Sequence, residues 1–138
     1  MADFSYKKVK GNKLRPIIPI FVSSGKNGVQ YEVLVDSGAD CNVFDAEIGE
    51  AIGIDIKSGT PDQIKGVDGR GIDCWVHEVR VTVVGEGLVT VKTAFTYSLP
   101  LEGYGLVGQN GFFDHFIVRF DYNQGKVSVT KNNSPLVN

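Results

Sequence analysis

The sequence is poor in cysteine, with only Cys41 and Cys74, and it lacks long apolar runs. Two cysteines cannot form the disulfide framework of a small secreted domain, so we expect reduced thiols. No stretch approaches the roughly 18 apolar residues of a membrane-spanning helix. Residues 1–16 are polar and basic and contain no apolar segment like that of a signal peptide. These absences predict a cytoplasmic protein without a membrane partner.

Neither sign of charge dominates the sequence. The chain has 14 Lys and Arg against 16 Asp and Glu, a formal net charge of −2, and no long basic run. A nucleic-acid partner is therefore not expected, because binding a phosphate backbone needs a clustered basic face. The 138 residues suit one domain that buries roughly two-thirds of its unfolded surface. We place that domain at 16–131, with an N-terminal arm at 1–15 and a C-terminal tail at 132–138.

The 17 glycines separate short apolar runs, which is typical of a mostly β protein. Val79, Val81 and Val83 alternate with polar residues, as in a half-buried strand, whereas Ile48 and Ile52 have helical spacing. We predict one short helix at 45–52 and a helical turn at 112–116. The predicted strands cover 17–23, 29–35, 76–84, 89–97, 117–120 and 126–130.

The chemistry is concentrated after the predicted strand 29–35, where the sequence reads Asp36-Ser37-Gly38-Ala39-Asp40. The strand would carry the Asp36 carboxylate out of the core into a tight loop, in which glycine permits close backbone approach and serine can hydrogen-bond locally. An Asp-Ser/Thr-Gly triplet arises by chance in roughly one chain in twenty of this length. Alone, the motif is equally consistent with an ordinary turn at a strand end.

Two further segments add to this motif. They are Ile64-Lys65-Gly66-Val67-Asp68-Gly69 and Leu106-Val107-Gly108-Gln109-Asn110. In this order and spacing, the sequence resembles the retropepsin-like aspartic peptidases over residues 16–130. Their catalytic loop reads Asp-Thr/Ser-Gly-Ala, their flap Ile-x-Gly-Ile/Val-x-Gly, and their late strand apolar-apolar-Gly-x-Asn/Asp. The aromatic turn and closing hairpin at 111–130 look more like cellular and bacterial members, such as the protease domain of DNA-damage-inducible proteins, than the shorter viral enzymes.

The resemblance implies a small closed antiparallel β-barrel of the acid-protease type with one or two short helices. It also implies an aspartic endopeptidase that works as a homodimer on a peptide or protein substrate, without metal or organic cofactor. Asp36 would be catalytic, and Ser37 and Gly38 would support its loop. Segment 64–69 would be the flap. The residues implied to contact substrate are Gly38, Ala39, Asp40, Ile64, Gly66, Val67, Asp68, Gly69 and Val107.

The need for a homodimer follows from the chemistry of the class. Peptide hydrolysis by aspartic peptidases uses two carboxylates that share one proton. The chain offers one suitable aspartate, so a second copy must supply the other. By resemblance, Ser37 would hydrogen-bond across the dimer and Gly108 would let its strand pass close behind the catalytic loop.

The sequence departs from the viral pattern at two positions. Gln109 stands where the viral enzymes have an arginine that pairs with the acid equivalent to Asp40. Asp68 occupies a flap position that is commonly glycine. These departures keep a second hypothesis open, in which the chain is a peptide-binding or dimerisation module without turnover. A third hypothesis is a processed fragment of a retroelement polyprotein. The Met1 start and compact end weakly favour an independent protein instead.

Metal sites fit the sequence less well. Asp36, Asp40, Asn42 and Glu47 have the spacing of a calcium loop, but Gly38 and Cys41 stand where that loop needs an oxygen ligand and a glycine. Zinc could use one close pair, Cys74-x-x-His77, with two single residues elsewhere, yet no second close ligand pair completes such a site. The candidate zinc ligands are Cys41, Cys74, His77 and His115.

Overall fold

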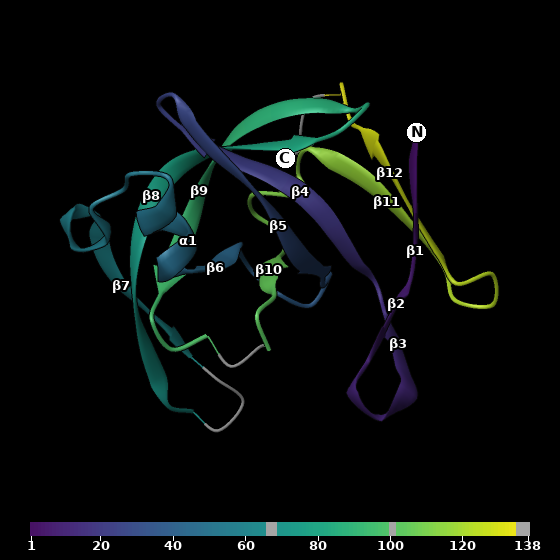
Figure 1. The fold of residues 1–138 in the computed structure, drawn as a ribbon, viewed down its shortest axis with the longest axis horizontal. Coiled ribbons are helices and arrows are strands. Elements are labelled where there is room, and N and C mark those ends of the chain that lie inside the picture. Colours follow the sequence, from purple (N-terminus) through teal and green to yellow (C-terminus); the bar gives the residue numbers. More distant parts are fainter. Residues whose placement is uncertain (66–68, 100–101, 135–138) are drawn as a thin grey trace.

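The computed structural model describes residues 1–65, 69–99 and 102–134 (Figure 1). Its strands are β1 (Ala2–Ser5), β2 (Lys7–Val9), β3 (Lys13–Arg15), β4 (Ile17–Ser24), β5 (Asn27–Val35), β6 (Val43–Asp45), β7 (Thr60–Lys65), β8 (Gly71–Val83), β9 (Gly87–Thr96), β10 (Gly105–Val107), β11 (Phe116–Asp121) and β12 (Lys126–Lys131). The helical elements are α1 (Ala46–Ala51) and two 3₁₀ turns, Lys10–Asn12 and Ile56–Ser58. No helix in this part of the chain is long and apolar enough to cross a membrane.

Six strands form a ring of hydrogen-bonded neighbours in the order β4-β5-β10-β6-β9-β8, which closes because β4 also pairs with β8. Most neighbours are antiparallel, but β5 and β10 are parallel, and so are β6 and β9. Strand β7 extends the sheet beyond β8. The prediction of a mostly antiparallel β fold with little helix is confirmed.

Most of the core residues come from the strands of this ring, and the segment that contains β11 and β12 adds others. Alternating residues of β8 point inward, so that Val79, Val81 and Val83 are buried as their spacing predicted. Two buried aromatic rings, Phe44 and Phe95, meet edge-on with their centroids 5.9 Å apart. Each such side chain contributes about 1.5–3 kcal/mol by leaving water. This packing makes the ring a rigid frame for the loops that leave it.

The predicted local elements are found close to their expected positions. Strands β4 and β5 form the first hairpin, and β11 and β12 form the last. The predicted helix is α1, where the Asp45 carboxylate accepts a hydrogen bond of 2.9 Å from the Glu47 amide and so caps the first turn. The expected helical turn at 112–116 contains a bond of 2.8 Å from the Phe116 amide to the Phe112 carbonyl.

Three N-terminal strands were not foreseen. Strand β1 pairs with β12 from Ala2 opposite Val129 to Ser5 opposite Lys126, in a separate sheet of order β1-β12-β11. Strands β2 and β3 form a hairpin of their own, drawn in purple in Figure 1. The pairing of β1 depends on residues more than a hundred positions away, and no local pattern encodes it.

Strand β10 passes directly behind the loop that follows β5. Its Val107 lies opposite Val35, and the following residue, Gly108, packs against that loop. A Cβ atom on Gly108 would lie 2.5 Å from the Ala39 carbonyl oxygen and 2.8 Å from that of Cys41. Only glycine permits this approach, as the sequence motif predicted.

We expect Gly108→Ala to lower the free energy of unfolding by about 1–3 kcal/mol, because the added methyl group must displace two backbone carbonyls. Gly71→Ala is a matched control, since its new Cβ would meet chiefly the end of the exposed Gln63 side chain, which can rotate away. Urea unfolding followed by Trp75 fluorescence compares the two variants. Equal stability of both would show that the approach behind the loop is not tight.

Candidate active site

Asp36 is the first residue after β5, and hydrogen bonds within its loop and to β10 fix the loop's conformation. The Asp36 amide donates to the Val107 carbonyl at 3.0 Å, which attaches the loop to β10. The Ala39 amide donates to the Asp36 carbonyl at 3.1 Å, and the Gly38 amide donates to Asp36 Oδ1 at 2.9 Å. The half-buried carboxylate is therefore oriented by its own turn.

The segment after β10 supports the loop from behind. The Gln109 amide donates to the Ala39 carbonyl at 2.8 Å, and the Asn110 amide donates to the Asp40 carbonyl at 2.9 Å. Gln109 Nε2 donates to the Ser37 carbonyl at 2.8 Å. Gln109 thus hydrogen-bonds to the backbone of the Asp36 loop through both its main chain and its side chain.

Asn42 is a buried polar residue that ties the same two segments together. Its Oδ1 accepts a hydrogen bond of 3.1 Å from the Gly108 amide, and its Nδ2 donates to the Gly111 carbonyl at 3.2 Å. The amide is used inside the fold, so it does not face a calcium ion as the loop spacing would require. We had not predicted this support. Its only signal in the sequence is an amide placed directly before the apolar pair Val43 and Phe44.

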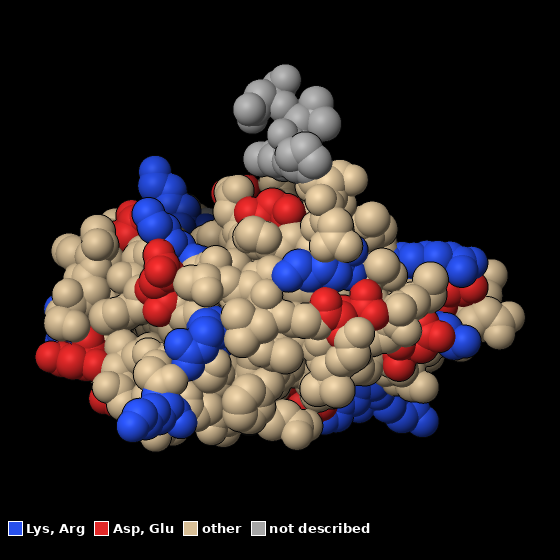
Figure 2. Space-filling model, turned by 90° about the horizontal axis from the view of Figure 1, so that it is seen from above, with Lys and Arg blue, Asp and Glu red and all other residues tan. Residues whose placement is uncertain are grey.

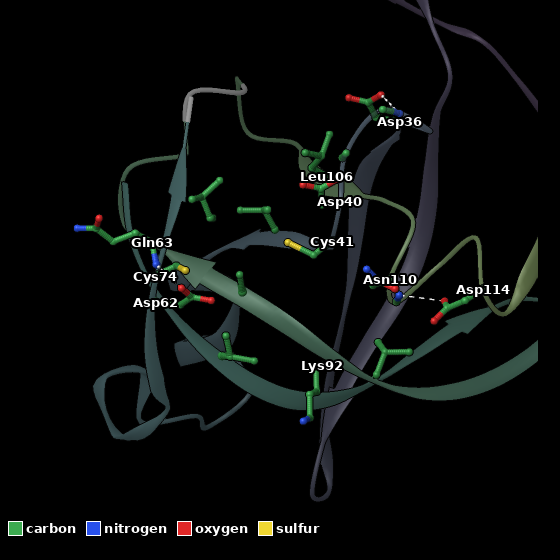
Figure 3. Close-up of a pocket in the computed structure, with 18 of the residues that line it drawn as sticks. Asp36, Asp40, Cys41, Asp62, Gln63, Cys74, Lys92, Leu106, Asn110 and Asp114 are labelled. Carbon is green, nitrogen blue, oxygen red and sulfur yellow. Dashed lines mark hydrogen bonds between the residues drawn. The ribbon is translucent and has the colours of Figure 1, made fainter. Parts of the chain in front are cut away.

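A cleft of about 960 Å³ is lined by residues of the Asp36 loop, of β7, β8 and β9, and of the segment 106–115. In Figure 3, Asp40 and Cys41 from the loop lie on one side, and Asp62, Gln63 and Cys74 from β7 and β8 lie on the other. The lining residues are Asp36, Gly38, Ala39, Asp40, Cys41, Val43, Asp62, Gln63, Ile64, Lys65, Cys74, Val76, Thr90, Val91, Lys92, Ala94, Leu106, Asn110, Gly111, Asp114 and His115. The cleft joins a carboxylate to an extended, partly apolar surface.

Most of the described residues predicted to contact substrate lie on this cleft. Gly38, Ala39, Asp40 and Ile64 line it. Val107 is buried in the core, and its neighbour Leu106 lines the cleft in its place. Gly69, which was also predicted to contact substrate, is exposed, and so is Ser37, which was predicted to support the loop. The predicted flap residues Gly66, Val67 and Asp68 lie outside the described part of the chain.

The two cysteines on the cleft are poor nucleophiles. Burial raises the pKa of the Cys41 thiol, and the nearby carboxylates of Asp40 and Asp62 raise it further. Burial, with a smaller effect of Asp62, raises the pKa of Cys74 to about 11. Both thiols are therefore protonated near neutral pH, whereas catalysis by cysteine needs the thiolate. The two thiols are therefore set aside, and the Asp36 carboxylate, which accepts from the Gly38 amide in the predicted motif, is the candidate for chemistry.

The four candidate zinc ligands do not form a metal-binding group among the described residues. His77 Nε2 lies 2.7 Å from the Ile56 carbonyl oxygen and is engaged there, while Cys74 lines the cleft. In residues 1–65, 69–99 and 102–134, no three His, Cys, Asp or Glu side chains are grouped as metal ligands would be.

On the face drawn in Figure 2, acidic and basic side chains are interspersed. Neither sign forms a continuous field on this face. This side of the described structure therefore offers no extended basic surface of the kind that binds a phosphate backbone.

Solved structures with the same fold include two proteases. A retropepsin-like aspartic protease from Rickettsia conorii aligns with a TM-score of 0.62 at 14% identity, over 94% of this chain and 98% of that one. The EIAV protease in complex with an inhibitor aligns with a TM-score of 0.51 at 19% identity, over 72% of this chain and 86% of that one. No curated protein sequence matches. A particular likeness to DNA-damage-inducible proteins stays a prediction.

A model of the aspartyl protease family matches residues 22–110. The matched segment contains the Asp36 loop, the strands β7 and β8 that face it across the cleft, and Gly108, which directly follows β10 and packs behind the loop. Since this segment is more than half of the sequence and the fold is retropepsin-like, the chain belongs to the aspartyl protease family.

Proposed function

We propose that the chain is an aspartic endopeptidase whose active form is a homodimer with one Asp36 from each subunit. The observation that carries the proposal is the position of Asp36, which is held by a braced loop that lines the cleft. The family supports the peptidase activity. Because the chain has a single Asp-Ser-Gly motif, the second carboxylate comes from a second copy.

The proposed chemistry needs the two carboxylates to share one proton. Two like charges about 3 Å apart do not both ionise readily, so the pair works in the singly protonated state. The ionised carboxylate takes a proton from water as it attacks the peptide carbonyl carbon. The protonated carboxyl group donates its proton to the carbonyl oxygen. The water molecule thereby adds to the carbonyl. The carboxyl group that took the water's proton then gives it to the peptide nitrogen, and the other carboxylate takes a proton from a hydroxyl of the intermediate. The C–N bond breaks, and the amine and the new carboxylic acid leave.

The loop supports this chemistry through its backbone. Hydrogen bonds from Gly38 to the carboxylate, and from the Gln109 side chain to Ser37, reduce the freedom of the reacting group. A preorganised carboxylate loses less entropy when the transition state forms. We further propose that the Ser37 hydroxyl bonds across the dimer, where the two loops meet.

The cleft fits an extended peptide as substrate. Its volume of about 960 Å³ is near the upper end for small-molecule pockets, and its lining mixes apolar side chains with polar groups. Residues 64–69 connect the walls formed by β7 and β8, and we propose that they close over the peptide as a flap. Closure of such a segment excludes water from the reacting bond.

We expect Asp36→Asn to abolish peptide hydrolysis, with a loss of at least about 10²–10⁴-fold, because an amide cannot act as the general base. The variant should fold and dimerise as well as wild type, since it removes a like-charge repulsion. Asp55→Asn makes the same chemical change at an exposed carboxylate outside the cleft and should keep full activity. Hydrolysis of a mixed peptide library, with unfolding curves for each variant, checks this.

Subunit mixing tests whether both carboxylates of a dimer are needed. When Asp36→Asn chains are added in excess, most wild-type chains should sit in mixed dimers, and activity per wild-type chain should fall. Constant activity despite proven subunit exchange would mean that each chain works alone. An Asp36→Asn variant that remains active would contradict the proposed chemistry, and wild-type protein that binds peptides without cleaving them would identify a binding module.

We expect activity to be greatest in mildly acidic solution and to survive metal chelation. A shared proton requires a pH at which one carboxylate of the pair is protonated, so the rate should follow a bell-shaped curve and fall toward alkaline pH. Hydrolysis measured across pH, with and without a chelator, gives the comparison. Loss of activity on chelation and its recovery with added zinc would contradict a carboxylate mechanism.

A further inference from the structure

The β2–β3 hairpin extends away from the rest of the molecule (Figure 1). None of its residues 7–15 is buried, and its turn contains Gly11 and Asn12 with φ angles of 78° and 60°. A Cβ atom added to Gly11 would meet nothing within 4 Å. An isolated two-stranded hairpin is only marginally stable in water, so this one is expected to pack against a partner.

The hairpin concentrates positive charge. Residues 7–15 hold five of the 14 Lys and Arg and no acidic residue, which gives them a formal charge of +5. The remaining 9 basic and 16 acidic residues give the rest of the chain a formal charge of −7. Near its start, Lys7 pairs with Glu32 at 2.6 Å. Within the described residues, no carboxylate pairs with the side chains farther along, which are Lys8, Lys10, Lys13 and Arg15.

The base of the hairpin lies beside the catalytic loop. Directly after β3, the Pro16 carbonyl accepts a hydrogen bond of 3.0 Å from the amide of Val35, the residue before Asp36. The next residue, Ile17, lies opposite Leu34 in the β4–β5 pair. The hairpin therefore leaves the molecule at the same edge as the Asp36 carboxylate.

We propose that this hairpin is an arm that packs on the partner subunit of the homodimer. The inference rests on the proposed function, in which the two Asp36 side chains meet at a twofold axis. Hairpins rooted beside Asp36 then lie at the boundary between subunits. The basic arm meets a second copy whose other residues carry a formal charge of −7, and complementary charge favours this contact. A nucleic acid fits less well, because the net negative charge of the remaining residues repels a polyanion.

The experiment compares two matched double variants of the full chain. Lys10→Glu with Lys13→Glu reverses charge in the β2–β3 hairpin. The control, Lys26→Glu with Lys57→Glu, makes the same charge change at exposed lysines of the β4–β5 turn and of the Ile56–Ser58 turn. Sedimentation gives the dimer dissociation constant at low and high salt, and unfolding curves confirm that each variant folds. We expect the hairpin variant to raise the dissociation constant about tenfold or more, and the control to leave it nearly unchanged.

Two further readouts distinguish a failure of the arm proposal from a failure of the catalytic proposal. Wild-type dimerisation should weaken as salt rises, because screening reduces the charge attraction. At concentrations where the hairpin variant is fully dimeric, its activity per chain should equal that of wild type. If Asp36-dependent activity and dimerisation are intact in wild type but the hairpin variant dimerises equally well, only the arm is excluded.

Other results overturn the arm in different ways. A wild-type chain that is active as a monomer excludes both the arm and the proposed dimer. A hairpin variant with normal dimerisation that loses binding to a fluorescent single-stranded DNA oligonucleotide would assign the hairpin to nucleic acid.

Discussion

The contact between β10 and the Asp36 loop is the constraint on which the site depends. The Asp36 amide is bound to the Val107 carbonyl, and Gly108 packs against the Ala39 and Cys41 carbonyls. Because β10 also lies between β5 and β6 in the ring, the loop is braced by the same sheet that encloses the core. The sheet therefore restricts the position of the Asp36 carboxylate. A loop that held the same residues without this backing would keep the motif but lose its fixed orientation.

Much of the fold could be predicted from the sequence where local pattern and burial agree. The alternation of Val79, Val81 and Val83 correctly predicted β8, and the turn glycines correctly separated β4 from β5. The short strand β6 was missed, because three residues are too few to show a period, and β10 was expected from the family motif alone. Strand β1 was missed for another reason, since its partner β12 lies at the other end of the chain.

The candidate site was predictable as far as its motifs extend. The Asp36 triplet and the Gly108 motif predicted a loop and a strand that meet, and the structure places them together. The support from Asn42 and from the Gln109 side chain was not predicted. Both side chains hydrogen-bond to backbone atoms of distant segments, and a residue name carries no information about such a partner. Substitution at such positions alters the site without touching its motif.

The central claim is that one active site is built from two chains. The most direct measurement is the binding stoichiometry of a peptide-like inhibitor that carries a hydroxyl group in place of the scissile carbonyl, titrated calorimetrically into wild-type protein. Such a molecule imitates the tetrahedral intermediate and binds where both carboxylates act. Two Asp36 residues sharing one site predict one inhibitor for every two chains, and no such tight binding to Asp36→Asn. One inhibitor bound per chain would contradict the shared site.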